Sequence, residues 1–278
     1  MNLADMTIGG IETSLGVPPY KAKQIYKWIR RGETDPYNMT DQAIALREKM
    51  KNEYNITWPH VYKKFASSLD ETVKYLIELS DGNIVETVLM SYEHGYSICI
   101  STQVGCRMGC RFCASTMDGL IRNLTPSEIE GQVRAVSDDS GKRISSIVVM
   151  GIGEPMDNYD NLVTAIRALN NPDGMGIGIR HITVSTCGLP EGIKRLTEEN
   201  LPVTLALSLH APTDEIRKTI MPAAKMATIE ELLKLTDNYA EKTGRRVTFE
   251  YALIRGVNDS IECARELGKL LSGRLCHV

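Results

Sequence analysis

Three cysteines stand within the eight residues from Cys106 to Cys113, in the pattern C-x-x-x-C-x-F-C. Thiolates this close together suit a metal ion or an iron–sulfur cluster. A four-iron cluster has four corners and is normally held by four cysteine thiolates. Three protein ligands would leave one iron open to bind another group. We therefore predict that Cys106, Cys110 and Cys113 hold a [4Fe–4S] cluster with one open position.

Two other interpretations of the cysteines compete with this one. Structural zinc sites close with four ligands, usually as two separated pairs, and no second pair follows Cys113. The three side chains could also be small apolar residues of a loop. Cys99, seven residues before Cys106, adds a further ambiguity. It could be a buried core cysteine, a fourth ligand or a thiol directed into the site.

The composition is 42% hydrophobic and 24% charged among 278 residues, as in an ordinary soluble protein. This length fits one large α/β domain with or without a small accessory one. No apolar run approaches the roughly 18 residues of a membrane span, and no signal peptide is visible. The seven cysteines are unevenly spaced, which suits a reducing cytosol rather than a secreted disulfide framework. We expect a cytoplasmic protein with no membrane contact.

The chain is expected to divide into three parts. Residues 1–58 form a helical accessory domain, in which Pro18-Pro19 opens one helix and a second runs from Asp41, capped by Thr40, to about Tyr54. Residues 59–96 contain a β-hairpin whose strands, 73–79 and 84–90, flank a turn with glycine. Residues 97–278 alternate strands with helices.

Six strands are predicted in the third part. They lie near residues 97–104, 143–150, 181–186, 203–209, 247–253 and 274–278. Strands that alternate with helices imply βαβ units and a parallel sheet. We predict an α/β fold that resembles a partial (βα)6 TIM-like barrel. In such a barrel the active site lies at the carboxyl ends of the strands. Four unusual segments fall there: the cysteine loop, Gly151–Pro155, Thr186–Gly188 and Ser208–His210.

Each strand-end motif has a structural and a functional interpretation. Gly151-x-Gly153-Glu154 lacks the third glycine of a dinucleotide loop, so it is either a simple turn or a grip for an amino group or a ribose. Ser185, Ser208 and His210 are, taken singly, more often caps or buried polar groups. Their shared position at strand ends favours a ligand site.

The net charge is −3, yet basic residues cluster early in the chain. These are Lys21, Lys23, Lys27, Arg30 and Arg31, followed later by Lys63 and Lys64. Such a cluster could contact phosphates or form a solvated helix face. Glu86 lies between apolar residues of a predicted strand, and this pattern by itself indicates a carboxylate that faces solvent.

Together these motifs carry a resemblance to radical S-adenosylmethionine enzymes, and more narrowly to the RlmN/Cfr family of RNA adenine methyltransferases. The Gly-Glu-Pro loop is similar to the RlmN-like branch. The matching segments follow one another along nearly the whole chain: 85–88, 99–106, 122–125, 151–159, 208–212 and 256–259.

The resemblance implies a mechanism and a set of roles. One S-adenosylmethionine methylates a cysteine of the enzyme, and a second binds the cluster and is cleaved to a 5′-deoxyadenosyl radical. The radical activates the methyl group for addition to C2 of adenine. Glu86 matches a carboxylate proposed to take the C2 proton, and Cys99 matches the thiol that releases product by forming a disulfide. The implied cofactor contacts are Gly153, Glu154, Ser185, Ser208, Leu209 and His210.

The resemblance also implies partners. The RNA substrate would be 23S ribosomal RNA, with transfer RNA as a second candidate, and the helical domain would contact it through the basic cluster. A reducing electron donor such as flavodoxin or ferredoxin is needed, and we expect a monomer. The methyl-carrying cysteine of the family lies beyond Val278, and Cys263 and Cys276 do not match it. We therefore expect a C-terminally truncated chain that binds the cluster but does not methylate RNA.

Two alternatives belong to other classes. Another radical enzyme, such as a glycyl-radical activase, would share the cluster and the Gly-Glu-Pro loop but would not need Cys99 or the basic helical part. A non-catalytic RNA-binding module would instead close a zinc site with Cys99, Cys106, Cys110 and Cys113. Iron content after anaerobic purification separates the enzymes from the zinc module.

Overall fold

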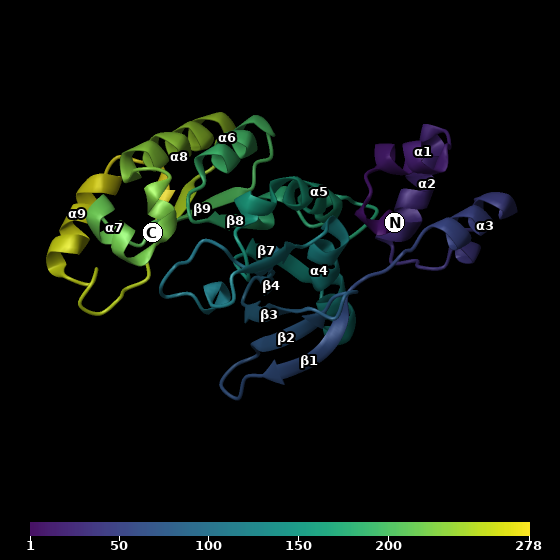
Figure 1. Cartoon of the computed structure of the whole chain (residues 1–278), viewed down its shortest axis with the longest axis horizontal. Helices are drawn as coiled ribbons and strands as arrows, with labels where there is room; N and C mark the ends of the chain where they lie inside the picture. The colour runs from purple at the N-terminus through teal and green to yellow at the C-terminus, as the bar shows by residue number, and fades with distance from the viewer. The chain divides into compact units, whose positions relative to one another are not determined.

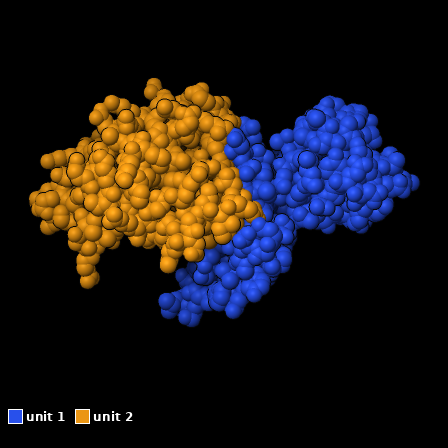
Figure 2. Space-filling view, viewed as in Figure 1, with its two compact units in different colours: residues 1–100, 124–146, 160–178 blue, residues 101–123, 147–159, 179–278 orange.

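The computed structural model describes residues 1–278, and the chain forms two compact units (Figure 2). Unit 1 comprises residues 1–100, 124–146 and 160–178, and unit 2 comprises residues 101–123, 147–159 and 179–278. Each unit is assembled from separate stretches of sequence. The predicted boundaries near residues 58 and 96 remain predictions.

Unit 1 begins with helices α1 (Ile8–Leu15), α2 (Pro19–Arg30) and α3 (Ile44–Glu53), after a 3-10 turn at Leu3–Asp5. Proline at the first position of α2 suits a helix start, because its missing N–H has no intrahelical partner there. These helices bury a shared apolar core. The helix predicted at Pro18-Pro19 is confirmed.

The predicted start of the second helix is wrong. Helix α3 begins three residues later, at Ile44, with Ala43 as its N-cap. The side chain of Arg47 donates to the carbonyl oxygens of Thr40 and Gln42, at 2.7 and 2.8 Å. These bonds stabilise a turn at the residues that would have formed the first helical turn.

Unit 1 also holds an antiparallel sheet in the order β1 (His60–Ala66), β2 (Val73–Glu78), β3 (Ile84–Tyr92), β4 (Gly95–Cys99) (Figure 1). The predicted hairpin is confirmed as β2 and β3. One further strand pairs on each side of this hairpin. The resulting sheet meets the general requirement of three or more strands with an apolar face for stability.

Side chains alternate between the two faces of this sheet. Tyr75, Ile77 and Val85 are buried on the face that packs against helix α4 (Pro126–Ser140). The Tyr75 hydroxyl donates to Asp139 of that helix at 3.1 Å, and Thr87 donates to Gln132 at 2.9 Å. We call this side the packed face, and the opposite side, which carries Lys74 and Glu86, the open face.

Helix α4 starts with the predicted capping box, in which Thr125 and Glu128 each accept a backbone N–H from the other. Helix α5 (Tyr159–Asn170) supplies further core residues to unit 1. Strand β7 (Ile144–Val149) begins in unit 1 and ends in unit 2.

Unit 2 continues with parallel strands β8 (Ile182–Thr186), β9 (Thr204–Ser208), β10 (Val247–Glu250) and β11 (Cys276–His277) beside the end of β7. Between them lie helices α6 (Pro190–Glu198), α7 (Asp214–Ile220), α8 (Ile229–Thr243) and α9 (Ile261–Leu271). The strands pair in chain order, as successive βαβ units require. The predicted mixed α/β fold is confirmed.

The strand predicted at residues 97–104 is two strands. Strand β4 ends at Cys99, and a short strand, β5 (Gln103–Gly105), pairs with β6 (Leu120–Asn123) in a separate two-stranded sheet. The Thr102 N–H donates to the Ile152 carbonyl at 2.9 Å, and Ser101 Oγ accepts from the Ile152 N–H at the same distance. These bonds redirect the backbone before β5, which the apolar pattern does not reveal.

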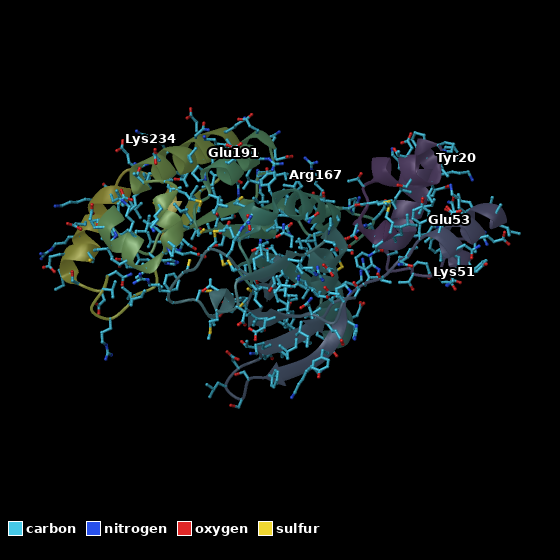
Figure 3. All side chains as sticks on the ribbon, viewed as in Figure 1. Tyr20, Lys51, Glu53, Arg167, Glu191 and Lys234 are labelled. Carbon is cyan, nitrogen blue, oxygen red and sulfur yellow. The ribbon has the colours of Figure 1, made fainter.

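The helices of unit 2 are amphipathic. Helix α8 buries Leu232, Leu233 and Tyr239, whereas Lys234 points outward, as does Glu191 of α6 (Figure 3). None of the helices combines the length and the apolar character that crossing a membrane requires.

Candidate active site

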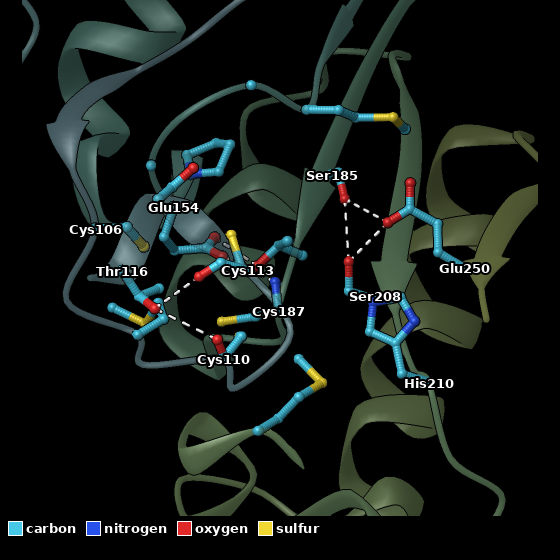
Figure 4. Close-up of a pocket in the computed structure, with 18 of the residues that line it drawn as sticks. Cys106, Cys110, Cys113, Thr116, Glu154, Ser185, Cys187, Ser208, His210 and Glu250 are labelled. Carbon is cyan, nitrogen blue, oxygen red and sulfur yellow. Dashed lines mark hydrogen bonds between the residues drawn. The ribbon is translucent and has the colours of Figure 1, made fainter. Parts of the chain in front are cut away.

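A cavity of about 220 Å³ lies in unit 2, at the carboxyl ends of β7, β8, β9 and β10 (Figure 4). Its lining comes from all four strand-end segments that the sequence singles out. The lining residues that matter below are Cys106, Cys110, Cys113, Glu154, Ser185, Cys187, Ser208, His210 and Glu250.

The cysteine loop is a long excursion between β5 and β6. It closes where the Cys106 N–H donates to the Gly119 carbonyl at 2.9 Å. Gly105 has φ +74°, and a Cβ there would overlap with the Gly119 carbonyl oxygen, so only glycine fits. Thr116 Oγ1 donates to the Cys113 carbonyl at 3.0 Å. The loop therefore holds its three thiols along one wall of the cavity.

The environment of Cys106 and Cys110 opposes a negative charge on their thiols. Burial, then repulsion from Cys113 and Cys106, raises the pKa of Cys110 to about 11, and burial also raises the pKa of Cys106. Thiolates are the form that binds metals. Three thiolates at this wall would therefore require a cationic partner to be stable.

Glu154 connects two strand ends. Its carboxylate accepts from the Met156 N–H at 3.0 Å, from Thr186 Oγ1 at 2.7 Å and from the Cys187 N–H at 2.8 Å. Burial raises its pKa, and these hydrogen bonds act in the opposite direction. The side chain thus fixes the loop after β7 to the loop after β8, while still lining the cavity.

Gly153, the residue before Glu154, must be glycine. Its φ is +106°, and a Cβ would meet the Gln103 backbone nitrogen at 2.8 Å, which a side chain does not tolerate. Gln103 Oε1 in turn accepts from the Glu154 N–H at 2.8 Å. The predicted cofactor loop therefore packs directly on the strand that begins the cysteine loop.

Ser185 and Ser208 end two neighbouring strands and face each other. Their hydroxyl oxygens lie 3.4 Å apart, and both donate to the same carboxylate oxygen of Glu250, at 2.9 and 2.7 Å (Figure 4). Glu250 is not among the site residues predicted from the sequence. The sequence does carry a signal for Glu250, because it is a carboxylate near the end of the strand predicted at 247–253.

His210 occupies the left-handed region, with φ +56°. Its Nδ1 accepts from the Ala252 N–H at 3.0 Å, which requires that this nitrogen carry no proton. The Asn258 side chain donates to the His210 carbonyl at 2.7 Å and to the Ala252 carbonyl at 2.8 Å. Burial lowers the pKa of His210, so the ring is neutral near pH 7.

A buried arginine, Arg217 of α7, supports the same loops. Its Nε donates to the Leu209 carbonyl at 3.1 Å and its Nη2 to the Cys187 carbonyl at 2.6 Å. Its Nη1 is buried without a hydrogen-bond partner. Arg217 is not among the residues predicted from the sequence, because a helix interior offers no motif. Cys187 lies in the predicted segment Thr186–Gly188 without a role of its own, and burial raises its pKa well above the ordinary value.

The remaining predicted site residues lie elsewhere. Leu209 is fully buried and does not line the cavity. Glu86 and Cys99 belong to unit 1, on the open face of its sheet. Glu86 is exposed and forms an ion pair with Lys74 at 3.0 Å. All seven cysteines carry thiols, so the disulfide implied by the resemblance is not supported.

The early basic cluster is only partly available to a partner. Arg30 is 2% exposed and forms an ion pair with Glu130, stacked 4.7 Å from the centroid of Tyr26. Lys27 pairs with Asp173 at 2.6 Å. The expectation that Arg30 contacts RNA is therefore wrong, because its guanidinium is buried in unit 1 and paired with Glu130. Lys23 and Arg31 remain exposed.

The residues of the cavity fit an iron–sulfur cluster and a polar cofactor. No three His, Cys, Asp or Glu side chains stand at the distances of a bound metal ion. The three thiols nevertheless share one wall, and a cluster would supply the positive charge that they lack. The opposite wall offers the two serine hydroxyls, Glu250 and a neutral imidazole. Such groups suit a ligand with hydroxyl, amino and carboxylate groups.

Comparison with known proteins agrees with this arrangement. Residues 100–267 match the Radical SAM superfamily, and residues 1–56 match the Ribosomal RNA large subunit methyltransferase N-terminal domain. A "Probable dual-specificity RNA methyltransferase RlmN" from Lachnoclostridium phytofermentans is 50% identical over 100% of this chain and 79% of its own length. The Alkaliphilus oremlandii protein of the same name is 49% identical, over 100% of this chain and 82% of its own length.

Among solved structures, the chain is similar to a methyltransferase along its whole length. The crystal structure of a radical SAM methyltransferase from Sphaerobacter thermophilus has a TM-score of 0.89 and 43% identity. The similarity covers 100% of this chain and 84% of that one.

Proposed function

Because the chain belongs to the RlmN family of radical S-adenosylmethionine RNA methyltransferases, we propose that the protein in its full-length form methylates C2 of an adenosine in 23S ribosomal RNA and in transfer RNA. The observation that carries the proposal is the cavity of unit 2, where three cysteine thiols face a wall of serine, glutamate and histidine side chains. The matched N-terminal domain favours an RNA methyltransferase over a glycyl-radical activase.

In this proposal the residues of the cavity would have different binding roles. Cys106, Cys110 and Cys113 would hold a [4Fe–4S] cluster, which supplies the electron that cleaves S-adenosylmethionine. Ser185, Ser208 and His210 would bind the nucleoside part of that cofactor. Gly153 would allow close approach of the backbone, and Glu154 would keep its loop in place.

Glu250 acts as a positioning residue in this scheme. One of its oxygens accepts both serine hydroxyls, so their protons are directed to Glu250 and their lone pairs are left for a ligand donor. The serine pair is thereby presented in one fixed arrangement, which lowers the entropic cost of cofactor binding.

The two residues proposed for the RNA chemistry lie in unit 1. Glu86 is assigned the role of accepting the C2 proton, and Cys99 the role of the releasing thiol. Val88, two residues after Glu86, lies directly opposite Cys99 in the β3–β4 register. The two functional groups therefore share the open face and are neighbours on adjacent strands. Exposed Lys23 and Arg31 are the remaining candidates for RNA contacts of the helical domain.

The test is mass spectrometry of adenosines from the ribosomal and transfer RNA of cells that carry or lack the gene. We expect 2-methyladenosine in both RNA classes, and its loss on deletion of the gene. A gene-replacement strain with Cys113→Ala should resemble the deletion strain. Unchanged 2-methyladenosine in the deletion strain would refute the proposal. An electron donor such as flavodoxin or ferredoxin is required for the reaction in this scheme.

A further inference from the structure

The open face of the unit 1 sheet carries an ordered row of side chains. Phe65 of β1 pairs with Lys74 of β2, Lys74 with Val88 of β3, and Val88 with Cys99 of β4. Directly opposed residues of an antiparallel sheet project on the same side. The row therefore crosses all four strands and ends at the proposed product-releasing thiol.

A second row runs beside the first. Lys63 of β1 lies opposite Leu76 of β2, which lies opposite Glu86 of β3. This row ends at the proposed proton acceptor. Both rows thus begin at the edge strand β1 and lead to a residue assigned to the chemistry.

The β1 ends of these rows form an aromatic platform with two cations. Phe65 is 44% exposed, and the ammonium groups of Lys63 and Lys74 lie 4.9 and 5.7 Å from its ring centroid. An exposed ring between ammonium groups suits single-stranded nucleic acid, because a base stacks on the ring while phosphates meet the cations. Lys74 already has an anionic partner in Glu86, but a stretch of apolar protein would leave the Lys63 ammonium without one, and a membrane surface would not need the ring.

We propose that the open face binds the RNA strand that flanks the target adenosine, with Phe65 stacking on a flanking base and Lys63 and Lys74 contacting phosphates. The inference rests on the proposed function, because that function places the target base at Glu86 and Cys99. Three strand spacings of about 4.8 Å separate Phe65 from Cys99, roughly 14 Å in all. At that distance from Cys99, Phe65 would lie beneath a neighbouring nucleotide of the same RNA strand and not beneath the target adenosine.

The chain provides a matched control on the same strand. Lys64, next to Lys63, lies opposite Tyr75 and pairs with Asp139 of α4 at 2.7 Å, so it belongs to the packed face. Lys63→Ala and Lys64→Ala remove the same charge from adjacent positions. Only Lys63→Ala removes it from the proposed RNA surface.

The experiment measures binding of the 278-residue protein to a fluorescently labelled RNA stem-loop with an adenosine in its loop, over a series of salt concentrations. Phe65→Ala should weaken binding roughly tenfold, as loss of one base–aromatic stack does. Lys63→Ala should weaken binding and reduce the slope of log affinity against log salt by about 0.7. Lys64→Ala should bind like the wild type. Thermal unfolding verifies that each variant is folded.

The outcomes separate this inference from the proposed function. Wild-type binding that Phe65→Ala and Lys63→Ala leave unchanged overturns the inference and leaves the function standing. Equal losses of RNA affinity in Lys63→Ala and Lys64→Ala would show that only net charge matters. That result would also overturn the inference. Self-association of Lys63→Ala with unchanged RNA affinity would show that the lysines protect a sheet edge instead. A wild-type protein that binds no RNA at low salt overturns the inference, whereas the proposed function is decided separately by the 2-methyladenosine content of the deletion strain.

Discussion

The cavity of unit 2 and the open face of unit 1 are built in opposite ways. In the cavity, Glu154 and Glu250 are fixed by hydrogen bonds from neighbouring strand ends. On the open face, Glu86 and Lys74 form an exposed ion pair with side chains 49% and 45% accessible. The carboxylates of the cavity accept hydrogen bonds from partly or fully buried groups, whereas the Glu86 carboxylate of the open face is held by a solvent-screened ion pair.

The difference matches two kinds of ligand. A small cofactor with many polar groups is best bound by groups already in place, because little entropy remains to be lost. A long polyanion gains its affinity from cations that release counterions, and exposed lysines serve this purpose without a preformed pocket. We therefore expect substitutions in the cavity to have larger effects than substitutions on the open face.

The largest effect is expected for the cysteine loop. Cys110→Ser should remove nearly all iron from anaerobically purified protein, because a three-thiolate set has no spare ligand. Iron content and visible absorbance are the measurements. Cys263→Ser, a buried cysteine of α9 outside the cavity, is the control and should retain iron like the wild type. An iron-loaded Cys110→Ser protein would disprove the assignment.

A matched pair of carboxylates tests the contrast in stability. Glu154→Ala leaves three donors without their acceptor in a buried place, and should cost about 3 kcal/mol or more of unfolding free energy. Glu86→Ala removes one exposed ion pair, and should cost less than about 1 kcal/mol. Denaturant unfolding of both variants is the measurement. Equal losses of unfolding free energy in the two variants would show that the cavity and the open face do not differ in this way.

A smaller effect is expected at Glu250. Glu250→Ala should weaken binding of S-adenosylmethionine to the cluster-loaded protein by about tenfold, since the two serines lose the charged acceptor that orients them. Glu250→Gln keeps an acceptor oxygen and should fall between the alanine variant and the wild type. Calorimetric titration under anaerobic conditions measures both. Wild-type affinity in Glu250→Ala would exclude a positioning role.

The smallest effect concerns pH. Burial lowers the pKa of His210 below its ordinary 6.5, with Arg217 acting in the same direction and Glu250 against it. The unfolded chain therefore binds the proton more readily. The stability due to His210 is complete above pH 6.5 and is lost as pH falls through the lower folded-state pKa.

His210→Gln should remove this part of the pH dependence, because its amide oxygen can replace Nδ1 as acceptor without titrating. Melting temperatures at pH 7.5 and pH 5 for both proteins supply the comparison. An equally steep decline in the variant would assign the pH sensitivity to other groups.

Local sequence signals predicted much of the molecule. The C-x-x-x-C-x-F-C spacing located the loop that lines the cavity, and Thr125 and Glu128 located the start of α4. Alternation of strands and helices predicted the α/β fold, and the ends of those strands predicted which segments would meet. These features follow from backbone geometry and periodicity, which short stretches of sequence encode.

Other features depend on contacts between distant residues. The break between β4 and β5 is caused by bonds to Ile152, about 50 positions away, and the burial of Arg30 by its pairing with Glu130. Neither partner is visible in the local pattern. Arg30 in particular lies in a run of basic residues that, by composition alone, favours a solvated or RNA-binding face.

The sequence by itself determined the cysteine spacing, the strand-end motifs and the resemblance to radical S-adenosylmethionine RNA methyltransferases. Only the tertiary structure decided that Ser185 and Ser208 share one oxygen of Glu250, and that Phe65, Lys74, Val88 and Cys99 form one row. The physical reason is register. Which residues of separate strands stand opposite each other depends on how the strands pair, and no single segment carries that information.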